Sequence, residues 1–498
     1  MPHSSTPQSS FTSLPDDDSS AEVRHDLVRS SDDSAHSSIA HLYRRAGFGL
    51  STAELDLAVS AGYRASVEHL LAGGGGAPDP TGDQIAPPSF APYQPITATH
   101  GTPEALAAAR AQRQAQHAEL APLQTWWLNR MIVTSTPLRE KMTLLWHGHF
   151  ATAVSKVADP YLMYLQNQLF RGAGTASFAD LTQAVAKDGA MMKWLDTTKD
   201  KKAHPNENFA RELMELFTLG VGNYTQTDVE QAARSFTGWT YSRSANRWSL
   251  VAAQHDNGNK TFLGRSGNLG GEEVIAAIVA QPASARFVVA KVWSHLAYPV
   301  APSDPVVGDL LASYGPAMNL TELLRAVFNH PAFVSPAARN GLIKQPIEYL
   351  VGAARALRLD AELQRLDPST GLPATASPPG GRKVMTPGSS PKSLVQAATA
   401  LAQTPFDPTN VGGWPQNGYW LNTATALARM SVAQLLATKA DLAAIESVPL
   451  SQRLAATAQL LGVVDGWGPT TAGALAKAAA EPASLVALAL NSPEYVLN

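Results

Sequence analysis

The sequence contains no cysteine. Disulfides, thiolate catalysis, cysteine-bound zinc and iron–sulfur clusters are therefore excluded. Any bound metal would need His, Asp, Glu or neutral oxygen donors as ligands. The absence of cysteine suits an exported protein and a cytoplasmic protein equally well.

Charged residues are also scarce, at 16% of the chain, where about 25% is usual. The 38 basic and 41 acidic side chains give a formal net charge of −3, so we expect no nucleic-acid partner, which would need a basic surface. No stretch reaches the roughly 18 apolar residues that a spanning helix needs, so we expect no membrane span. Because the sequence does not begin with a basic head and an apolar run, it predicts a cytoplasmic location and leaves export by another route open.

Strand-type alternation is nearly absent, and a helical period dominates from Ile39 onward. Helix starts are marked by a capping box at Ser51–Glu54 and by Thr136 followed by Pro137. At most a short β-hairpin fits between Trp239 and Leu263. The pattern therefore predicts an all-α fold, a large multi-helix single domain or two helical lobes, with long Pro/Gly-rich loops.

Three segments fall outside the helical pattern. Residues 1–38 are rich in Ser and Asp and predict a disordered tail, which leaves 39–498 as the helical domain. Loops rich in Pro and Gly are expected near 73–95 and 367–391. Between these loops, one long helix is expected over 103–132, with its candidate core positions at Leu106, Leu120, Leu123, Trp127 and Met131.

Short motifs occur along the chain in a characteristic order, at His41–Gly49, Trp146–Phe150, Pro205–Gly220, Tyr224–Thr225, Thr237–Trp239, His255–Lys260, Lys344–Glu348, Val411–Pro415 and Ser492–Tyr495. With these motifs, residues 39–498 resemble the bacterial family catalogued as domain of unknown function 1800. The resemblance implies a large helical bacterial domain without an assigned activity. It also implies a phosphatase- or sulfatase-like partner protein, because genes of that kind often lie beside those of the family.

The motif at Pro205–Gly220 predicts a helix with one polar side. At about 100° per residue, Asn208, Arg211, Glu212 and Glu215 fall within one stripe about 100° wide. The carboxylates of Glu212 and Glu215 are three residues apart and can converge on one point, as in helical di-metal sites. A solvated face, on which Arg211 screens two acids, is the alternative interpretation.

The second motif contains two histidines, His147 and His149. On a continuous helix, residues two apart point about 200° away from each other, so their rings cannot reach one ion. They converge only if the helix ends near Trp146 and the chain becomes extended. The alternatives are a neutral imidazole that acts as a ligand or general base, and two structural histidines beside aromatic residues.

The third candidate segment is the loop that contains His255, Asp256 and Lys260. Such residues commonly form local turns with their own backbone. If His255 and Asp256 joined Glu212 and Glu215, they would complete a nitrogen and oxygen ligand set that suits zinc, manganese or non-haem iron.

These patterns lead to one favoured hypothesis and one rival. The favoured hypothesis is a metal-assisted enzyme, either a hydrolase or an oxidoreductase, that binds a divalent Zn, Mn or Fe ion. Its catalytic residues would be Glu212, Glu215 and His149, its substrate-binding residues Arg211, Lys260 and Asn208, and its metal ligands His147, His149, Glu212, Glu215, His255 and Asp256. The rival is a non-catalytic binding or assembly module that acts with the phosphatase- or sulfatase-like protein.

Overall fold

The structure is a computed structural model that describes residues 34–99, 101–366 and 391–497. Helices dominate these residues, and the strands form two small two-stranded sheets, so the predicted all-α class is confirmed. The expected loop at 73–95 contains a single short helical turn, η1 (Gly82–Gln84). The loop expected at 367–391 lies outside the described residues except for its last position.

The first part of the chain forms a series of helices whose first turns are set by prolines and capping side chains. Ser51 makes the predicted capping box with Glu54, and Pro137 occupies the first turn of its helix as expected. The elements are a helix at residues 34–46, α2 (Thr52–Ala61), α3 (Tyr63–Ala72), η1, α4 (Pro103–Val133), α5 (Pro137–His149), α6 (Val154–Val157), α7 (Pro160–Ala173), α8 (Phe178–Ala186), α9 (Gly189–Trp194) and η2 (Thr197–Lys199).

The middle part contains all the strands that the structure describes. Its elements are α10 (Glu207–Glu212), η3 (Leu213–Thr218), α11 (Gln226–Phe236), β1 (Trp239–Ser242), β2 (Arg247–Leu250), η4 (Ala252–Gln254), β3 (Lys260–Phe262), β4 (Arg265–Gly267), α12 (Gly271–Val279), α13 (Pro282–Leu296), α14 (Pro305–Tyr314), α15 (Leu320–Asn329), η5 (Pro331–Val334) and α16 (Pro336–Arg339). β1 pairs antiparallel with β2, Trp239 opposite Leu250, and β3 pairs antiparallel with β4. The sequence predicted at most one hairpin, so the second one is a correction; its strands are only three residues long, too short to show alternation.

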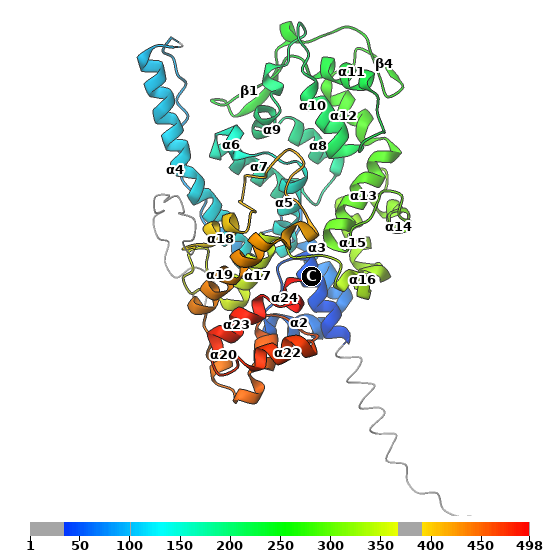
Figure 1. The fold of residues 1–498 in the computed structure, drawn as a ribbon. Coiled ribbons are helices and arrows are strands. Elements are labelled where there is room, and N and C mark those ends of the chain that lie inside the picture. The colour runs from blue at the N-terminus through cyan, green and yellow to red at the C-terminus, as the bar shows by residue number, and fades with distance from the viewer. Residues whose placement is uncertain (1–33, 100, 367–390, 498) are drawn as a thin grey trace, which may run out of the picture.

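The last part is helical again. Its elements are α17 (Pro346–Leu357), α18 (Leu394–Ala400), η6 (Asn417–Trp420), α19 (Thr423–Lys439), α20 (Ala443–Glu446), η7 (Leu450–Gln452), α21 (Arg453–Leu460), α22 (Pro469–Ala476), α23 (Pro482–Leu490) and α24 (Pro493–Val496). In Figure 1 these helices lie at one end of the molecule, and α8 to α12 lie at the other end.

The buried hydrophobic side chains form two clusters. The first joins the helix at 34–46 to α8 and to the elements from α10 to α15, and the second joins the carboxyl-terminal half of α4 to the helices from α17 to α24. Helix α5 contributes to both, since Met142 and Trp146 belong to the first cluster and Leu144 to the second. The boundary between these clusters is the seam at which the pocket described below is found.

Two expectations about exposed segments need correction. The amino-terminal half of α4 stands away from the body (Figure 1), and Leu106 is 49% exposed there, although a core position was predicted. Residues 34–38, which were expected to belong to the tail, are helical. They are held because Ser37 donates to Asp465 at 2.6 Å and the Arg339 guanidinium donates to the Ser38 hydroxyl at 3.0 Å.

Among the described helices, none by itself is long and apolar enough to cross a membrane. The pair α12 and α13 reaches the required length and hydropathy only when the two are taken together, and they are bent by 71° relative to each other.

Candidate functional site

The helix of the Pro205–Gly220 motif changes its hydrogen bonding midway. Glu207–Glu212 form the α-helix α10, and Leu213–Thr218 continue as the π-helical turn η3. A π-helical turn has i to i+5 hydrogen bonds, and such turns are frequent at functional sites. The predicted convergence of Glu212 and Glu215 assumed regular α-helical spacing, which the wider turn does not preserve.

Glu212 and Glu215 are both partly exposed. Burial, and after it the negative charge of Glu215, raises the pKa of Glu212. The Tyr224 hydroxyl donates to Glu215 Oε2 at 2.7 Å. The partner that the structure gives this acid is thus a phenol from the neighbouring turn.

The three predicted substrate-binding side chains contact the protein itself. Arg211 forms a half-exposed ion pair with Glu207 at 2.9 Å. The Asn208 amide donates to the Leu195 carbonyl at 3.3 Å. Lys260 is almost fully buried, and its Nζ donates to the Asp256 carbonyl at 2.6 Å and to the Gly258 carbonyl at 3.2 Å. These contacts are local and hold the turns together.

His147 and His149 point to different parts of the core because α5 continues through both of them. The Asn167 amide donates to His147 Nε2 at 3.0 Å, and burial lowers the pKa of this histidine well below its ordinary value. His149 Nε2 donates to the Phe217 carbonyl at 2.9 Å, and burial lowers its pKa to about 3. Both imidazoles are therefore neutral, and each is surrounded by aromatic rings.

His255 and Asp256 brace the loop that follows the first hairpin. His255 Nδ1 donates to the Thr237 carbonyl at 2.8 Å. Both carboxylate oxygens of Asp256 accept from the Arg234 guanidinium, at 2.7 and 3.2 Å, and this pairing lowers the Asp256 pKa to about 2. The loop motif thus ties the strands to α11, in the way that a structural turn does.

The structure does not bring the predicted metal ligands together. Across residues 34–99, 101–366 and 391–497, no group of three or more His, Asp or Glu side chains is placed to hold a metal ion. The physical reasons are the continuous α5, which separates the two histidines, and the arginine pair, which occupies Asp256. Of the predicted catalytic residues, Glu212 and Glu215 lie near each other, and His149 belongs to the aromatic core.

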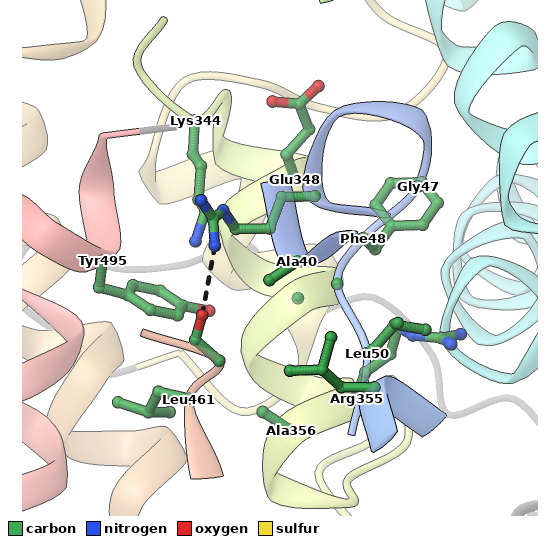
Figure 2. Close-up of a pocket in the computed structure, with 15 residues that line it drawn as sticks. Ala40, Gly47, Phe48, Leu50, Lys344, Glu348, Arg355, Ala356, Leu461 and Tyr495 are labelled. Carbon is green, nitrogen blue, oxygen red and sulfur yellow. Dashed lines mark hydrogen bonds between the residues drawn. The ribbon is translucent and has the colours of Figure 1, made fainter. Parts of the chain in front are cut away.

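A different set of motif residues surrounds a pocket at the seam between the two hydrophobic clusters. The pocket is lined by the end of the helix at 34–46 and the turn after it, by Leu55 of α2, by Lys344 and α17, by the turn after α21, and by Tyr495 on α24. Figure 2 shows Lys344 and Tyr495 together on one side and Leu50 with Arg355 on the other. The volume open to the centre of a water molecule is about 40 Å³.

Two cationic side chains of this pocket make few polar contacts with the rest of the protein. Arg44 donates one hydrogen bond, from Nη1 to the Gly462 carbonyl at 3.3 Å. Lys344 is 8% exposed, and its Nζ lies 3.6 Å from the centre of the Tyr495 ring. Within the described part of the chain, this amino group has no hydrogen-bond acceptor and no ion-pair partner; the contact with the aromatic ring is its main one.

Positive charge exceeds negative charge around this pocket. Arg44, Lys141 and Arg45 act on Lys344, and Glu348 is the carboxylate that opposes them. Glu348 is already ion-paired with the buried Lys141. Asp465, which acts on Arg44, is largely exposed. The cluster therefore keeps a surplus of buried or half-buried cations.

The pKa values reflect this surplus. Burial, and next the charge of Arg44, lowers the pKa of Lys344 well below its ordinary value. Burial also lowers the pKa of Arg44 to about 10. For Glu348 burial acts to raise the pKa, but Lys141 and His295 more than offset it and the pKa is lowered. Glu348 is thus ionised, and Lys344 is the cation that the pocket stabilises least.

Sequence reasoning found the motifs at His41–Gly49, Lys344–Glu348 and Ser492–Tyr495 but gave their residues no chemical role. The sequence did contain a signal for charged groups at these motifs. Lys344 and Glu348 lie four residues apart at the start of a helix, and the consecutive arginines Arg44 and Arg45 precede a glycine turn. These residues come together only because segments about 300 and 450 positions apart in the sequence pack against each other. Helical periodicity does not predict contacts between such distant segments.

The motif order and the helical fold together define a family. The family described as "Protein of unknown function (DUF1800)" matches residues 41–497, so the chain belongs to it. The match runs from His41 to Leu497 and so includes every residue that lines the pocket, except Ala40. A search of the curated proteins finds no match, and neither does a search of the solved structures.

Proposed function

We propose that the protein binds a small anion, or the anionic group of a larger ligand, in the pocket between Arg44 and Lys344. The observation that carries this proposal is the surplus of cations at a site with little solvent. Like charges that are held together away from water repel one another, and an anion between them offsets that repulsion. Phosphate, sulfate and carboxylate groups fit a guanidinium by paired hydrogen bonds.

The size of the pocket supports a small ligand group. A single water molecule needs roughly 10–15 Å³ by the same measure of volume. A pocket of about 40 Å³ therefore holds a few waters or one small oxyanion. Apolar residues such as Phe48, Leu50 and Leu461 also line the pocket, and they keep the local dielectric low so that charge–charge attraction is strong.

This proposal is a form of the binding-module hypothesis rather than of the metal-assisted enzyme. The enzyme hypothesis needs a converging ligand set, which the described side chains do not offer. A phosphatase- or sulfatase-like partner, which the family resemblance implied, would release phosphate or sulfate, the same class of anion that this pocket suits. Elemental analysis of protein purified without a His-tag tests the metal hypothesis separately.

The direct test is calorimetric titration of the full chain with sulfate, phosphate and acetate. The buffer contains chloride only, at constant ionic strength, because general screening of surface charge would otherwise mimic binding. We expect one anion per chain. A hydrogen bond to a charged group contributes about 1.5–3 kcal/mol, so Arg44→Gln should weaken the affinity by about 10- to 150-fold.

The matched control is Arg64→Gln, because Arg64 is an exposed arginine on α3. It should leave anion affinity unchanged. Equal weakening by both variants, or no saturable binding of any of the three anions to the wild-type chain, would contradict the proposal.

A further inference from the structure

Lys344 differs from Lys141 and Lys260, two other buried lysines, in what its amino group contacts. Lys141 is ion-paired with Glu348, and Lys260 donates to two backbone carbonyls. Lys344 Nζ instead lies 3.6 Å from the Tyr495 ring centre and faces the pocket that it lines. An amino group without an acceptor, next to open space and another cation, is placed to react rather than to support the fold.

We propose that Lys344 is an amine nucleophile that forms an imine with the carbonyl carbon of a small oxo acid, whose carboxylate is held by Arg44. This inference rests on the proposed anion pocket and names its ligand class. The two groups that it needs, an amine and a guanidinium, line the same small space. An oxo acid carries one group for each of them, a carbonyl for the amine and a carboxylate for the guanidinium.

The physical basis is a shift of the amine toward its neutral form, because its surroundings disfavour the proton. Only the unprotonated form attacks a carbonyl, and enzymes obtain it by burying the lysine or by placing it next to another cation. Both conditions hold here, since burial and then the charge of Arg44 lower the Lys344 pKa.

The reaction balances without an oxidant or reductant. The Nζ lone pair attacks the carbonyl carbon and forms the carbon–nitrogen bond of a carbinolamine. The former carbonyl oxygen then leaves as water with the two protons of the amine, and a carbon–nitrogen double bond remains. The bound carboxylate does not take part, and its role is to position the carbonyl carbon.

The test is reductive trapping on the full-length protein with glyoxylate and cyanoborohydride. Peptide mapping by mass spectrometry then compares Lys344 with the exposed lysines Lys439 and Lys477 in the same sample. We expect Lys344 to be alkylated at least 10-fold faster than either exposed residue, and we expect the adduct at this position to be absent in Lys344→Met. Sulfate should slow the trapping by competing for Arg44.

A second arm replaces glyoxylate by acetaldehyde, which has no carboxylate. Slower trapping of Lys344 by acetaldehyde than by glyoxylate supports the carboxylate contact. If glyoxylate modifies Lys344 no faster than Lys439, the imine proposal is overturned, while calorimetric binding of sulfate would still support the anion pocket. If both aldehydes trap Lys344 equally and sulfate has no effect, the anion pocket is what fails.

Discussion

Replacing Lys344 by methionine should stabilise the ligand-free protein. At pH 7 the unfolded chain carries a proton on this lysine, whose ordinary pKa is 10.5, whereas the folded pocket disfavours that proton. Each pH unit corresponds to about 1.4 kcal/mol, so the shift can cost at most about 5 kcal/mol of folding free energy at pH 7, the limit at which the amine is fully neutral there. Methionine has a similar length, has no charge and keeps a favourable contact with the Tyr495 ring.

Replacement of buried charges by apolar side chains of similar volume gains about 1–4 kcal/mol in other proteins, and we expect a value in that range for Lys344→Met at pH 7. The gain should shrink as pH rises. Because the unfolded chain binds the additional proton, wild-type stability increases with pH, by at most about 1.4 kcal/mol per pH unit, until the pH reaches the ordinary pKa. The pH dependence identifies titration as the cause.

The assay is urea unfolding of the wild type, Lys344→Met and the exposed control Lys439→Met at pH 7, 8 and 9, followed by circular dichroism. The control should lie within about 0.5 kcal/mol of the wild type at every pH. A Lys344→Met protein that is less stable than the wild type at pH 7, or a gain that does not change between pH 7 and 9, would refute the description of Lys344 as a buried, uncompensated amine.

Three further predictions concern the fold. Glu140 is fully buried and accepts hydrogen bonds from two arginines and a tryptophan, so Glu140→Gln should destabilise the protein by about 3–5 kcal/mol in urea unfolding. Glu207→Gln is the control: it lies in a half-exposed ion pair and should change stability by less than about 0.5 kcal/mol. Similar effects of the two substitutions would contradict the network assigned to Glu140. Burial raises the pKa of Asp200 to about 7, so the folded chain holds a proton that the unfolded chain loses near pH 4. Wild-type stability should therefore fall as pH rises from 4 to 7, and Asp200→Asn should flatten that fall. An unchanged slope in the variant would count against the burial effect. A chain that begins at Ile39 should be less stable than one that begins at Ser34 by about 1–3 kcal/mol in the same assay. The shorter chain loses the first helical turn and the serine contacts of Arg339. Equal stability of the two chains would show that these contacts contribute nothing.

Local signals in the sequence were sufficient for most of the helices. The capping box at Ser51 and the first-turn proline Pro137 were predicted and are present. The same logic could have found α7, since Asp159 caps that helix and Pro160 follows it, but the segment was not assigned. These features depend on neighbouring residues only, which is why one sequence is enough to locate them.

Features that depend on distant contacts were not predictable in this way. Leu106 has a core-type position in the helical pattern but is exposed, because the first half of α4 extends beyond the body that would cover it. The change from α- to π-helical bonding after Glu212 has no local signal that we can identify. A hydrophobic pattern shows which side chains of a helix could be buried. It does not show whether another part of the chain lies there to cover them.

The candidate site illustrates the same limit. Residue type directed attention to His and Glu as metal ligands, yet α5 sends its two histidines to separate aromatic surroundings. Arg44, Lys344 and Tyr495 line the anion pocket, and each belongs to a sequence motif for which no chemical role was predicted. Only the packing of the two hydrophobic clusters against each other brings these three segments together.

The most direct test of the anion pocket is anomalous diffraction from crystals of the wild-type chain that contain selenate, a heavy analogue of sulfate. We predict an anomalous peak whose oxygens lie within hydrogen-bonding distance, about 2.7–3.2 Å, of the Arg44 guanidinium and the Lys344 amine, and its loss in Arg44→Gln crystals. A pocket without selenate in wild-type crystals that hold the ion elsewhere, or a peak at the same position that persists in Arg44→Gln, would contradict the account.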